Sequence, residues 1–253
     1  MYDTISSDYD RFVNWQGRLS VELPFILEKL HEKQAKYILD AATGTGMHAI
    51  ALAQLGYQAC GADISRGMID RARRNASSAG VQVRFEIAGF GALTQVFDQH
   101  SFDALLCLGN SLPHLLSIPE LSAALVDFAA CLKPDGLLVI QNRNFDAVMA
   151  QHDRWMEPQS HSEGDVEWIF QRFYDFDPDG LLTFNMVTLK REARGKWSQH
   201  VTSSLLRPLL KDELISSLAE AGFVNLAPLG NMTGAPFDPM SSPNLIVLAR
   251  LQS

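Results

Sequence analysis

The segment from Ile38 to Asp63 constrains the fold of this chain more than any other stretch of its sequence. It opens with a short apolar run, Tyr37–Leu39, of the kind that forms a buried strand in a parallel sheet. Gly44 and Gly46 come next, and they allow the backbone to turn sharply and to approach a ligand where a Cβ would block it. The segment therefore begins as a strand that ends in a tight, glycine-bearing turn.

A helix and a second strand are predicted directly after this turn. Met47–Leu55 has the composition of a helix, and Gly56 is suited to its C-terminal cap. Tyr57–Ala62 is predicted to be the next strand, with Asp63 at its carboxyl end. A carboxylate at that position can accept hydrogen bonds from two ribose hydroxyls, so the unit is predicted to bind a nucleoside-containing cofactor.

The spacing around the turn favours one class of cofactor over another. Ala42, Gly44 and Gly46 have a G-x-G-x-G spacing in which alanine replaces the first glycine. A dinucleotide-binding turn needs a third glycine three residues further on, where this chain has Ala49. Asp40, just before the turn, would repel a pyrophosphate but suits a cationic ligand. The pattern therefore speaks against a dinucleotide.

This combination resembles motif I, D/E-x-G-x-G-x-G, of the class I S-adenosylmethionine-dependent methyltransferases. The stretches KPDGLLVI (133–140) and LISSLAEAGFVNL (214–226) are similar to the fifth strand and the late helix and turn of that superfamily. The similarity covers about residues 37 to 250. It implies S-adenosylmethionine as the cofactor and S-adenosylhomocysteine as its product.

Three short matches resemble the glycine and sarcosine N-methyltransferases within this superfamily. They are the alanine before Thr43, close to that family's D-x-A-C-G-T-G, then LGNSLPHL (108–115), and NRNFD (142–146), similar to its RNYD. Two departures stand beside them: Thr43 replaces a cysteine, and AGFG (88–91) lacks the acid that many class I enzymes use to bind adenine. We therefore expect adenine to be recognised by backbone groups or by apolar contact with Phe90.

The remaining pattern predicts an α/β fold. Strands and helices alternate up to residue 141, three strands without helices follow, and a helix with two strands ends the chain. We expect a Rossmann-like, seven-stranded, mostly parallel sheet with helices on both faces, a C-terminal antiparallel hairpin and an inserted antiparallel strand cap. The predicted helices are 47–55, 68–79, 119–132 and 211–221, and the predicted strands are 37–39, 57–62, 81–87, 102–108, 137–141, 166–176, 181–192, 197–206, 223–229 and 245–251.

These elements predict a single methyltransferase domain, residues 1–253. Its core is expected at about 30–150 and 207–253, its inserted β cap at about 151–206, and an N-terminal lid segment at 1–29. In related enzymes such a segment folds over the cofactor, which makes Tyr9 the candidate to contact its methionine end. A surface position on a loosely docked helix is the alternative for Tyr9.

The composition excludes several kinds of partner. A net charge of −8 speaks against a nucleic-acid surface, and no apolar stretch is long enough to span a bilayer. The three cysteines lie in apolar runs and lack metal-ligand spacing, which suits a reducing compartment. We expect a cytoplasmic protein with a small-molecule substrate, no metal, no nucleic acid and no membrane contact. Whether it forms a homo-oligomer stays open.

Candidate site residues follow from the motifs and from the rule that open α/β sheets bind ligands beyond the carboxyl ends of their strands. For substrate binding and catalysis they are Arg143, Asn144 and His114. For the cofactor they are Tyr9, Asp40, Ala42, Thr43, Gly44, Gly46, Asp63, Ile64, Met68, Gly89, Phe90, Leu108, Gly109 and Asn110.

Arg143 carries the most specific expectation about the substrate. Its guanidinium can hold a carboxylate bidentately and so orient the nitrogen of an amino acid, as the resemblance implies for glycine. Its alternative role is a structural ion pair with Asp146 or another acid. His114 is either a base or polar contact or a histidine satisfied by backbone, and Asn110 can serve the cofactor or the substrate.

The predicted reaction is methyl transfer to a small acceptor, and the leading candidate is the amine of an amino acid or of a similar carboxylated amine. O- or C-methylation of a small aromatic metabolite is the alternative within the class, because four aromatic residues (Trp155, Trp168, Tyr174 and Trp197) fall in or near the predicted cap. A nicotinamide- or flavin-dependent oxidoreductase and a catalytically silent cofactor-binding module are the alternatives outside it.

Overall fold

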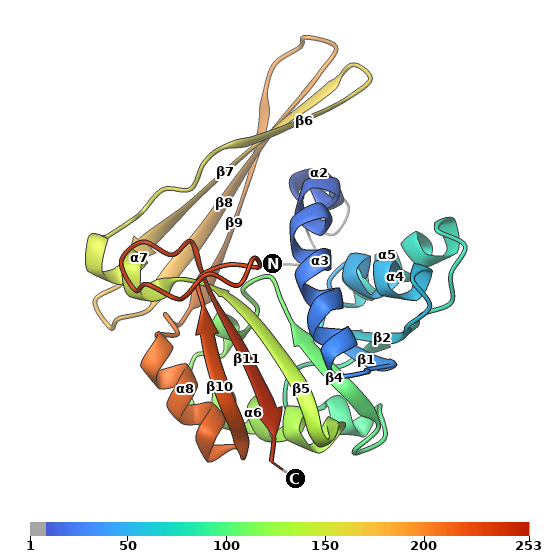
Figure 1. Cartoon of the computed structure of the whole chain (residues 1–253). Coiled ribbons are helices and arrows are strands. Elements are labelled where there is room, and N and C mark those ends of the chain that lie inside the picture. Colours follow the sequence, from blue (N-terminus) through green and yellow to red (C-terminus); the bar gives the residue numbers. More distant parts are fainter. Residues whose placement is uncertain (1–8, 253) are drawn as a thin grey trace.

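A computed structural model describes residues 9–252 and contains the predicted seven-stranded sheet (Figure 1). The strand order is β10-β11-β5-β4-β1-β2-β3, parallel from β5 to β3, with β11 antiparallel to both of its neighbours. The strands are β1 (Tyr37–Ala41), β2 (Gln58–Asp63), β3 (Arg84–Ile87), β4 (Phe102–Cys107), β5 (Leu132–Arg143), β10 (Phe223–Leu229) and β11 (Asn244–Leu251). This confirms the Rossmann-like sheet and its C-terminal antiparallel hairpin.

Helices cover both faces of this sheet because its strands are apolar on both sides (Figure 1). In β1, Ile38 packs with one helical layer and Leu39 with the other. The first layer holds α3 (Trp15–Glu32), α4 (Met47–Gln54) and α5 (Arg66–Ser78), and the second holds α6 (Ile118–Cys131) and α8 (Lys211–Glu220). Short 3₁₀ turns, η1 (Leu93–Gln95) and η2 (Leu112–His114), precede α6.

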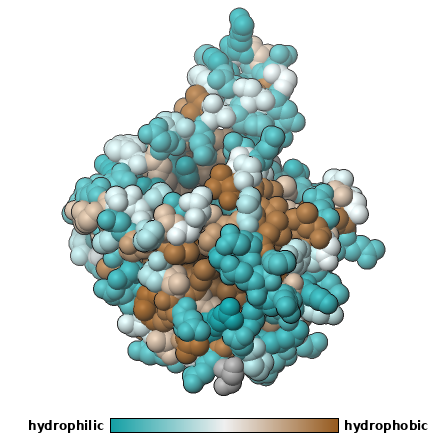
Figure 2. Space-filling model, viewed as in Figure 1, coloured by the Kyte–Doolittle hydropathy of each residue, from teal (hydrophilic) through white to brown (hydrophobic). Residues whose placement is uncertain are grey.

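The inserted cap is a separate antiparallel sheet in the order β6-β7-β8-β9. Its strands are β6 (Gln159–Glu163), β7 (Val166–Phe176), β8 (Leu182–Glu192) and β9 (Ser198–Leu206). They form a twisted arm that rises above the larger sheet (Figure 1). Figure 2 shows a mostly hydrophilic tip, with hydrophobic residues gathered nearer the base of the arm.

Several elements differ from the sequence prediction. The helix α3, with 18 residues, was not predicted, because only a lid segment was expected at 1–29. The strand β6 and the helix α7 (Phe145–Gln151) were not predicted, because QSHSE lacks apolar alternation and a helix of 7 residues leaves little periodicity. The strand β5 starts at Leu132 rather than at Leu137, because Leu132 already pairs with Phe102 of β4. The segment KPDG, predicted as a turn, therefore lies within β5, with Asp135 in a left-handed conformation.

The N-terminal segment lies between the core and the cap. The short helix α2 (Tyr9–Phe12) packs with Met68 of α5 and Met186 of β8, and the ring of Phe12 meets that of Phe170 at 5.5 Å. Residues 1–8 of the predicted lid, including the pair Tyr2 and Asp3, lie outside the described residues. Among residues 9–252, no helix is both long and apolar enough to cross a membrane.

Gly46, the last glycine of the turn after β1, is required by close packing. It begins α4 with a φ of 83°, and a Cβ placed on it would lie 2.7 Å from Phe85 and 2.9 Å from Ala72. Gly56, just after α4, has a similar φ of 90°, but nothing lies within 4 Å of its Cβ position. Both glycines thus adopt a left-handed backbone conformation, but only Gly46 lacks space for a Cβ.

We expect Gly46→Ala to lower the free energy of unfolding by about 3 kcal/mol and Gly56→Ala by about 1 kcal/mol. Both variants force alanine into a left-handed conformation, but only the first also meets Phe85 and Ala72. Urea unfolding of the two variants beside the wild type measures the difference. Equal losses would show that packing at Gly46 is not limiting.

Candidate active site

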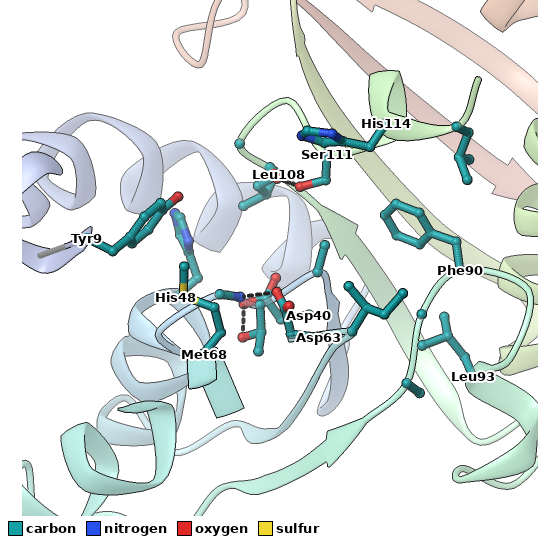
Figure 3. A pocket seen from close by; sticks show the side chains of 18 of the residues that line it. Tyr9, Asp40, His48, Asp63, Met68, Phe90, Leu93, Leu108, Ser111 and His114 are labelled. Atoms are coloured by element: carbon teal, nitrogen blue, oxygen red, sulfur yellow. Dashed lines mark hydrogen bonds between the residues drawn. The ribbon is translucent and has the colours of Figure 1, made fainter. Parts of the chain in front are cut away.

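A cavity of about 330 Å³ opens at the carboxyl ends of β1, β2 and β4, as Figure 3 shows. The acids Asp40 and Asp63 lie between two walls, one with Tyr9 and His48 and the other with Phe90 and Leu93. All the residues predicted to bind the cofactor line it except Gly46 and Asn110. Residues outside the cofactor prediction also line it: Trp15, Arg18, His48, Ala88, Leu93, Ser111, His114 and Leu115.

The floor of this cavity is fixed by the carboxylate of Asp63. One oxygen accepts a hydrogen bond from the backbone nitrogen of Gly44 at 2.9 Å, and the other accepts from that of Ser65 at 2.9 Å. Ala42, at the position of the missing glycine, has a φ of 60°, and Gly44 has a φ of 56°. The turn thus keeps the left-handed backbone that favours glycine even where alanine stands.

Asp40 lies at the bottom of the same cavity and is almost completely buried. It accepts a hydrogen bond of 2.6 Å from the hydroxyl of Thr43, so the residue that replaces the family's cysteine orients this acid. Burial raises the pKa of Asp40, while the nearby His48 and the Thr43 bond act in the opposite direction. The acid is therefore held inside the turn rather than presented to solvent.

One end of the cavity is apolar. Ile64 has 76% of its surface exposed, and Phe90 packs edge-on against Phe128 with ring centroids 5.5 Å apart. A Cβ on Gly89 would come within 3.1 Å of Ile64, so glycine keeps this end open. An exposed aliphatic side chain facing a supported ring, without an acid, suits a flat heterocycle recognised by apolar contact.

Two residues that line the cavity, Arg18 and His48, contact a buried carboxylate, Glu22, which does not line this cavity itself. It accepts hydrogen bonds from Arg18 at 2.9 Å and from Gln141 at 2.9 Å, and one of its oxygens lies 2.7 Å from Nε2 of His48. Burial alone would raise the pKa of Glu22, but His48, Arg18 and Gln141 together hold it at about 2. The ring of His48 also lies edge-on to that of Trp15, with centroids 5.6 Å apart, so His48 packs and positions this group of side chains.

A second carboxylate, Asp10, fastens the N-terminal segment over the cavity. It accepts hydrogen bonds from Trp15, Thr45, Arg71 and Asn75 at 2.9, 2.6, 2.9 and 3.1 Å. These donors come from α3, the turn after β1, and α5. Tyr9, the neighbouring residue, is thereby held at the cavity and is buried there, which raises the pKa of its hydroxyl.

A second cavity of about 270 Å³ adjoins the first and extends under the cap. Four residues line both cavities, namely Tyr9, Arg18, Gly109 and His114. The rest of its lining comes from α2, α3, the loop after β4, β5, the cap with the segment before it, and the start of β11: Phe12, Glu22, Asn110, Gln141, Asn142, Arg143, Met156, Arg172, Tyr174, Phe184, Met186, Leu206, Pro243 and Asn244. The structure thus provides two adjoining binding spaces with a shared border.

Of the substrate residues expected from the sequence, two line a cavity and one supports the surrounding structure. Arg143 lines the second cavity and forms an ion pair of 2.8 Å with Asp153, not with Asp146. His114 lines both cavities, and burial lowers its pKa to about 4. Asn144 lines neither cavity: it caps α7 and donates to backbone carbonyls of the 238–242 loop. Asn144 is therefore a structural residue at this site.

Two predicted cofactor contacts also lie elsewhere. Gly46 is packed beneath the turn against Phe85, and Asn110 lines the second cavity, where its side-chain oxygen accepts a hydrogen bond of 2.9 Å from the backbone of Arg143. Of the four aromatic residues considered for the acceptor pocket, Tyr174 lines it. The other three do not, since Trp155 and Trp197 are exposed and Trp168 is buried under Arg11.

Comparisons with known proteins agree with this geometry. Residues 38–136 match the family described as "Methyltransferase domain". Glycine/sarcosine N-methyltransferase of Aphanothece halophytica is 32% identical over 197 residues, which cover 73% of this chain and 72% of that protein. The enzyme of the same description from Parasynechococcus marenigrum (strain WH8102) is 38% identical over 198 residues, 72% of this chain and 68% of that protein.

A solved structure shows the same fold over the whole chain. It is an S-adenosylmethionine-dependent methyltransferase from Clostridium acetobutylicum ATCC 824, with a TM-score of 0.79 and 16% identity. The alignment covers 100% of this chain and 99% of that one. The cap and the core are thus shared in their arrangement, although the sequences have diverged widely.

The depressed pKa of Glu22 predicts a pH-dependent contribution to stability. A carboxylate with a folded-state pKa of about 2 and an ordinary value of 4.5 stabilises the fold above pH 4.5, and this contribution is lost as the pH falls toward 2. We expect Glu22→Gln to be less stable than the wild type at pH 7, and the gap to shrink by roughly 3 kcal/mol between pH 5 and pH 2. Urea unfolding across that pH range measures it.

Glu28→Gln is the matched control, because Glu28 is an exposed glutamate on the same helix. Its curve of unfolding free energy against pH should run parallel to that of the wild type. A Glu22→Gln curve that is also parallel to the wild type would contradict the prediction.

Proposed function

Because this chain belongs to the S-adenosylmethionine-dependent methyltransferases, in the family of the glycine/sarcosine N-methyltransferases, we propose that it methylates the amine of a small carboxylated amine such as an amino acid. The observation that carries the proposal is the pair of adjoining cavities. The first has the features of a cofactor site, and the second is polar, cationic and closed by the cap.

The first cavity suits S-adenosylmethionine at both ends. We assign the ribose hydroxyls to Asp63, the adenine to the space between Ile64 and Phe90, and the methionine end to Arg18 and Tyr9. Glycine at 109 leaves space beside Arg18, because a Cβ at that position would lie 3.4 Å from the Arg18 guanidinium. When bound, the cofactor supplies a methyl group activated by its sulfonium, so the protein mainly needs to align the acceptor and exclude water.

The second cavity suits a carboxylated amine. Three guanidinium groups line it, from Arg18, Arg143 and Arg172, against one carboxylate, that of Glu22. An amine with a free lone pair attacks the methyl carbon as the carbon–sulfur bond breaks, and the resulting ammonium loses a proton to water. His114 lies at the shared border, and its lowered pKa keeps its ring neutral there at pH 7, so it does not repel a cationic donor.

Methylation of oxygen or carbon on a small aromatic acceptor is less well supported by this cavity. Its charged lining favours an anionic acceptor over an apolar ring, and Tyr174 is the one member of the predicted aromatic group that faces it. We also propose a cytoplasmic location, which the three free cysteines support.

Ligand-dependent stabilisation tests the donor. We expect S-adenosylmethionine and S-adenosylhomocysteine to raise the thermal unfolding midpoint, with about 2.7 kcal/mol of stabilisation at 100 times the dissociation constant. NAD(H) should leave the midpoint unchanged. Asp63→Asn is expected to weaken the S-adenosylmethionine shift, because the amide removes one of the acceptors at the end of β2. A shift with NAD(H) alone would contradict the donor assignment.

The role of Arg143 is tested by the substitution Arg143→Lys. We expect roughly a tenfold or greater rise in KM for a carboxylated acceptor, since lysine cannot form a bidentate pair, and little change in S-adenosylmethionine binding. Assays with labelled methyl donor, glycine and sarcosine measure the effect. Arg143 also pairs with Asp153, so Asp153→Asn is the companion variant. Unchanged kinetics in Arg143→Lys would remove Arg143 from the acceptor site.

A further inference from the structure

Arg172 occupies an unusual position on the inner face of the cap. It lies on β7, lines the second cavity, and places its guanidinium carbon 4.8 Å from the ring centroid of Phe12. Its Nε atom is buried and has no hydrogen-bond partner within the described part of the chain. Buried polar groups nearly always have hydrogen-bond partners. The Nε–H group of Arg172 is therefore available to donate a hydrogen bond to a bound ligand.

The other two arginines of the cavity are already neutralised. Arg18 pairs with Glu22 at 2.9 Å, and Arg143 pairs with Asp153 at 2.8 Å. Among residues 9–252, no carboxylate lies within ion-pair distance of Arg172. The wall of the second cavity therefore carries one guanidinium whose charge has no counterion in the described chain.

The surroundings of Arg172 make this charge costly. Burial lowers its pKa, and the positive charge of Arg143 nearby acts in the same direction. Arginine nevertheless keeps its proton at neutral pH. A half-buried cation beside another cation is stabilised most directly by an anion that arrives with a ligand.

A second residue of the same cavity also has unsatisfied polar atoms. Asn142, on β5 of the core sheet, also lines the second cavity and is 1% exposed. Both its side-chain nitrogen and its side-chain oxygen are buried without a hydrogen-bond partner in the described residues. Two independent elements, β5 and β7, thus bring unpaired polar groups to one cavity, which points to a polar ligand rather than to a packing defect.

We propose that Arg172 binds the carboxylate of the methyl acceptor and selects for acceptors that carry one. The inference rests on the proposed function and adds the residue that supplies the uncompensated charge. Arg143, held by Asp153, then borders the same carboxylate without having to give up its ion pair. Tyr174 is close to both arginines, since it lies two residues from Arg172 on the same face of β7 and its ring centroid is 5.7 Å from the Arg143 guanidinium. The amine is left to point toward the border shared with the cofactor cavity.

The test compares acceptors with and without a carboxylate. Glycine and sarcosine are assayed beside methylamine and dimethylamine, their carboxylate-free counterparts, with wild type and Arg172→Gln. In the variant we expect KM for glycine and sarcosine to rise roughly tenfold to hundredfold, since a charge-assisted hydrogen bond is lost. The kinetics with the carboxylate-free amines and the thermal shift with S-adenosylmethionine should stay unchanged.

Arg154→Gln is the matched control. It removes an arginine near the cap that pairs with Asp175 and lines neither cavity. Equal KM values for glycine and sarcosine in Arg172→Gln and Arg154→Gln would overturn the inference while leaving the proposed function intact. A wild type that methylates neither glycine nor sarcosine, although it binds S-adenosylmethionine, would overturn both.

Arg172→Lys guards against a folding defect in the glutamine variant. If Arg172→Gln loses its cooperative unfolding transition, the role of Arg172 is judged instead from the KM values of the lysine variant, which keeps the charge. In Arg172→Lys, a rise in KM that is smaller than the rise expected for Arg172→Gln and is restricted to the carboxylated acceptors supports the assignment. A KM equal to that of the wild type for those acceptors overturns it.

Discussion

The carboxylate of Asp63 is the constraint on which the rest of the site depends. Its two oxygens accept hydrogen bonds from Gly44 and Ser65, and so tie together the loops that follow β1 and β2. Parallel pairing brings these loops to the same edge of the sheet, and the hydrogen bonds then set their separation. The walls of the cofactor cavity, from Ile64 to Tyr9, are positioned relative to that fixed floor.

The acceptor side depends on a different kind of contact. Asp10 fastens α2 to the turn and to α5, and Phe12 and Met186 then pack the cap against that segment. The second cavity exists only because core, N-terminal segment and cap meet around it. Much of its polar lining is consequently drawn from elements far apart in the chain, namely α3, β5 and β7.

This difference explains what the sequence could and could not predict. The alternation of strands and helices predicted the seven-stranded fold. The donor site is formed by residues at or next to strand ends, so glycine spacing, the acids at 40 and 63 and the family resemblance predicted most of that lining. Arg172 and Asn142 carry no local signal: one is an arginine in a cap strand and the other a strand residue beside Arg143. Asn144 shows the converse error, because an attractive position after β5 is used to cap α7. Contacts between distant strands decide such cases, and a single sequence does not encode their register openly.

The donor is bound by the core, whereas part of the acceptor pocket is formed by the cap, and this separation affects specificity. Side chains of β7, β8 and β9 alternate between the two faces of the cap, so a few inward positions control the acceptor pocket. Changes at those positions leave untouched the turn at 40–46 and the bonds of Asp63. The charge of the pocket can thus vary independently of donor binding, because the ion pairs Arg18–Glu22 and Arg143–Asp153 are closed within the core side, while Arg172 comes from the cap. Arg172, an arginine of the cap without a counterion, can therefore select for an anionic acceptor without disturbing the ion pairs of the core.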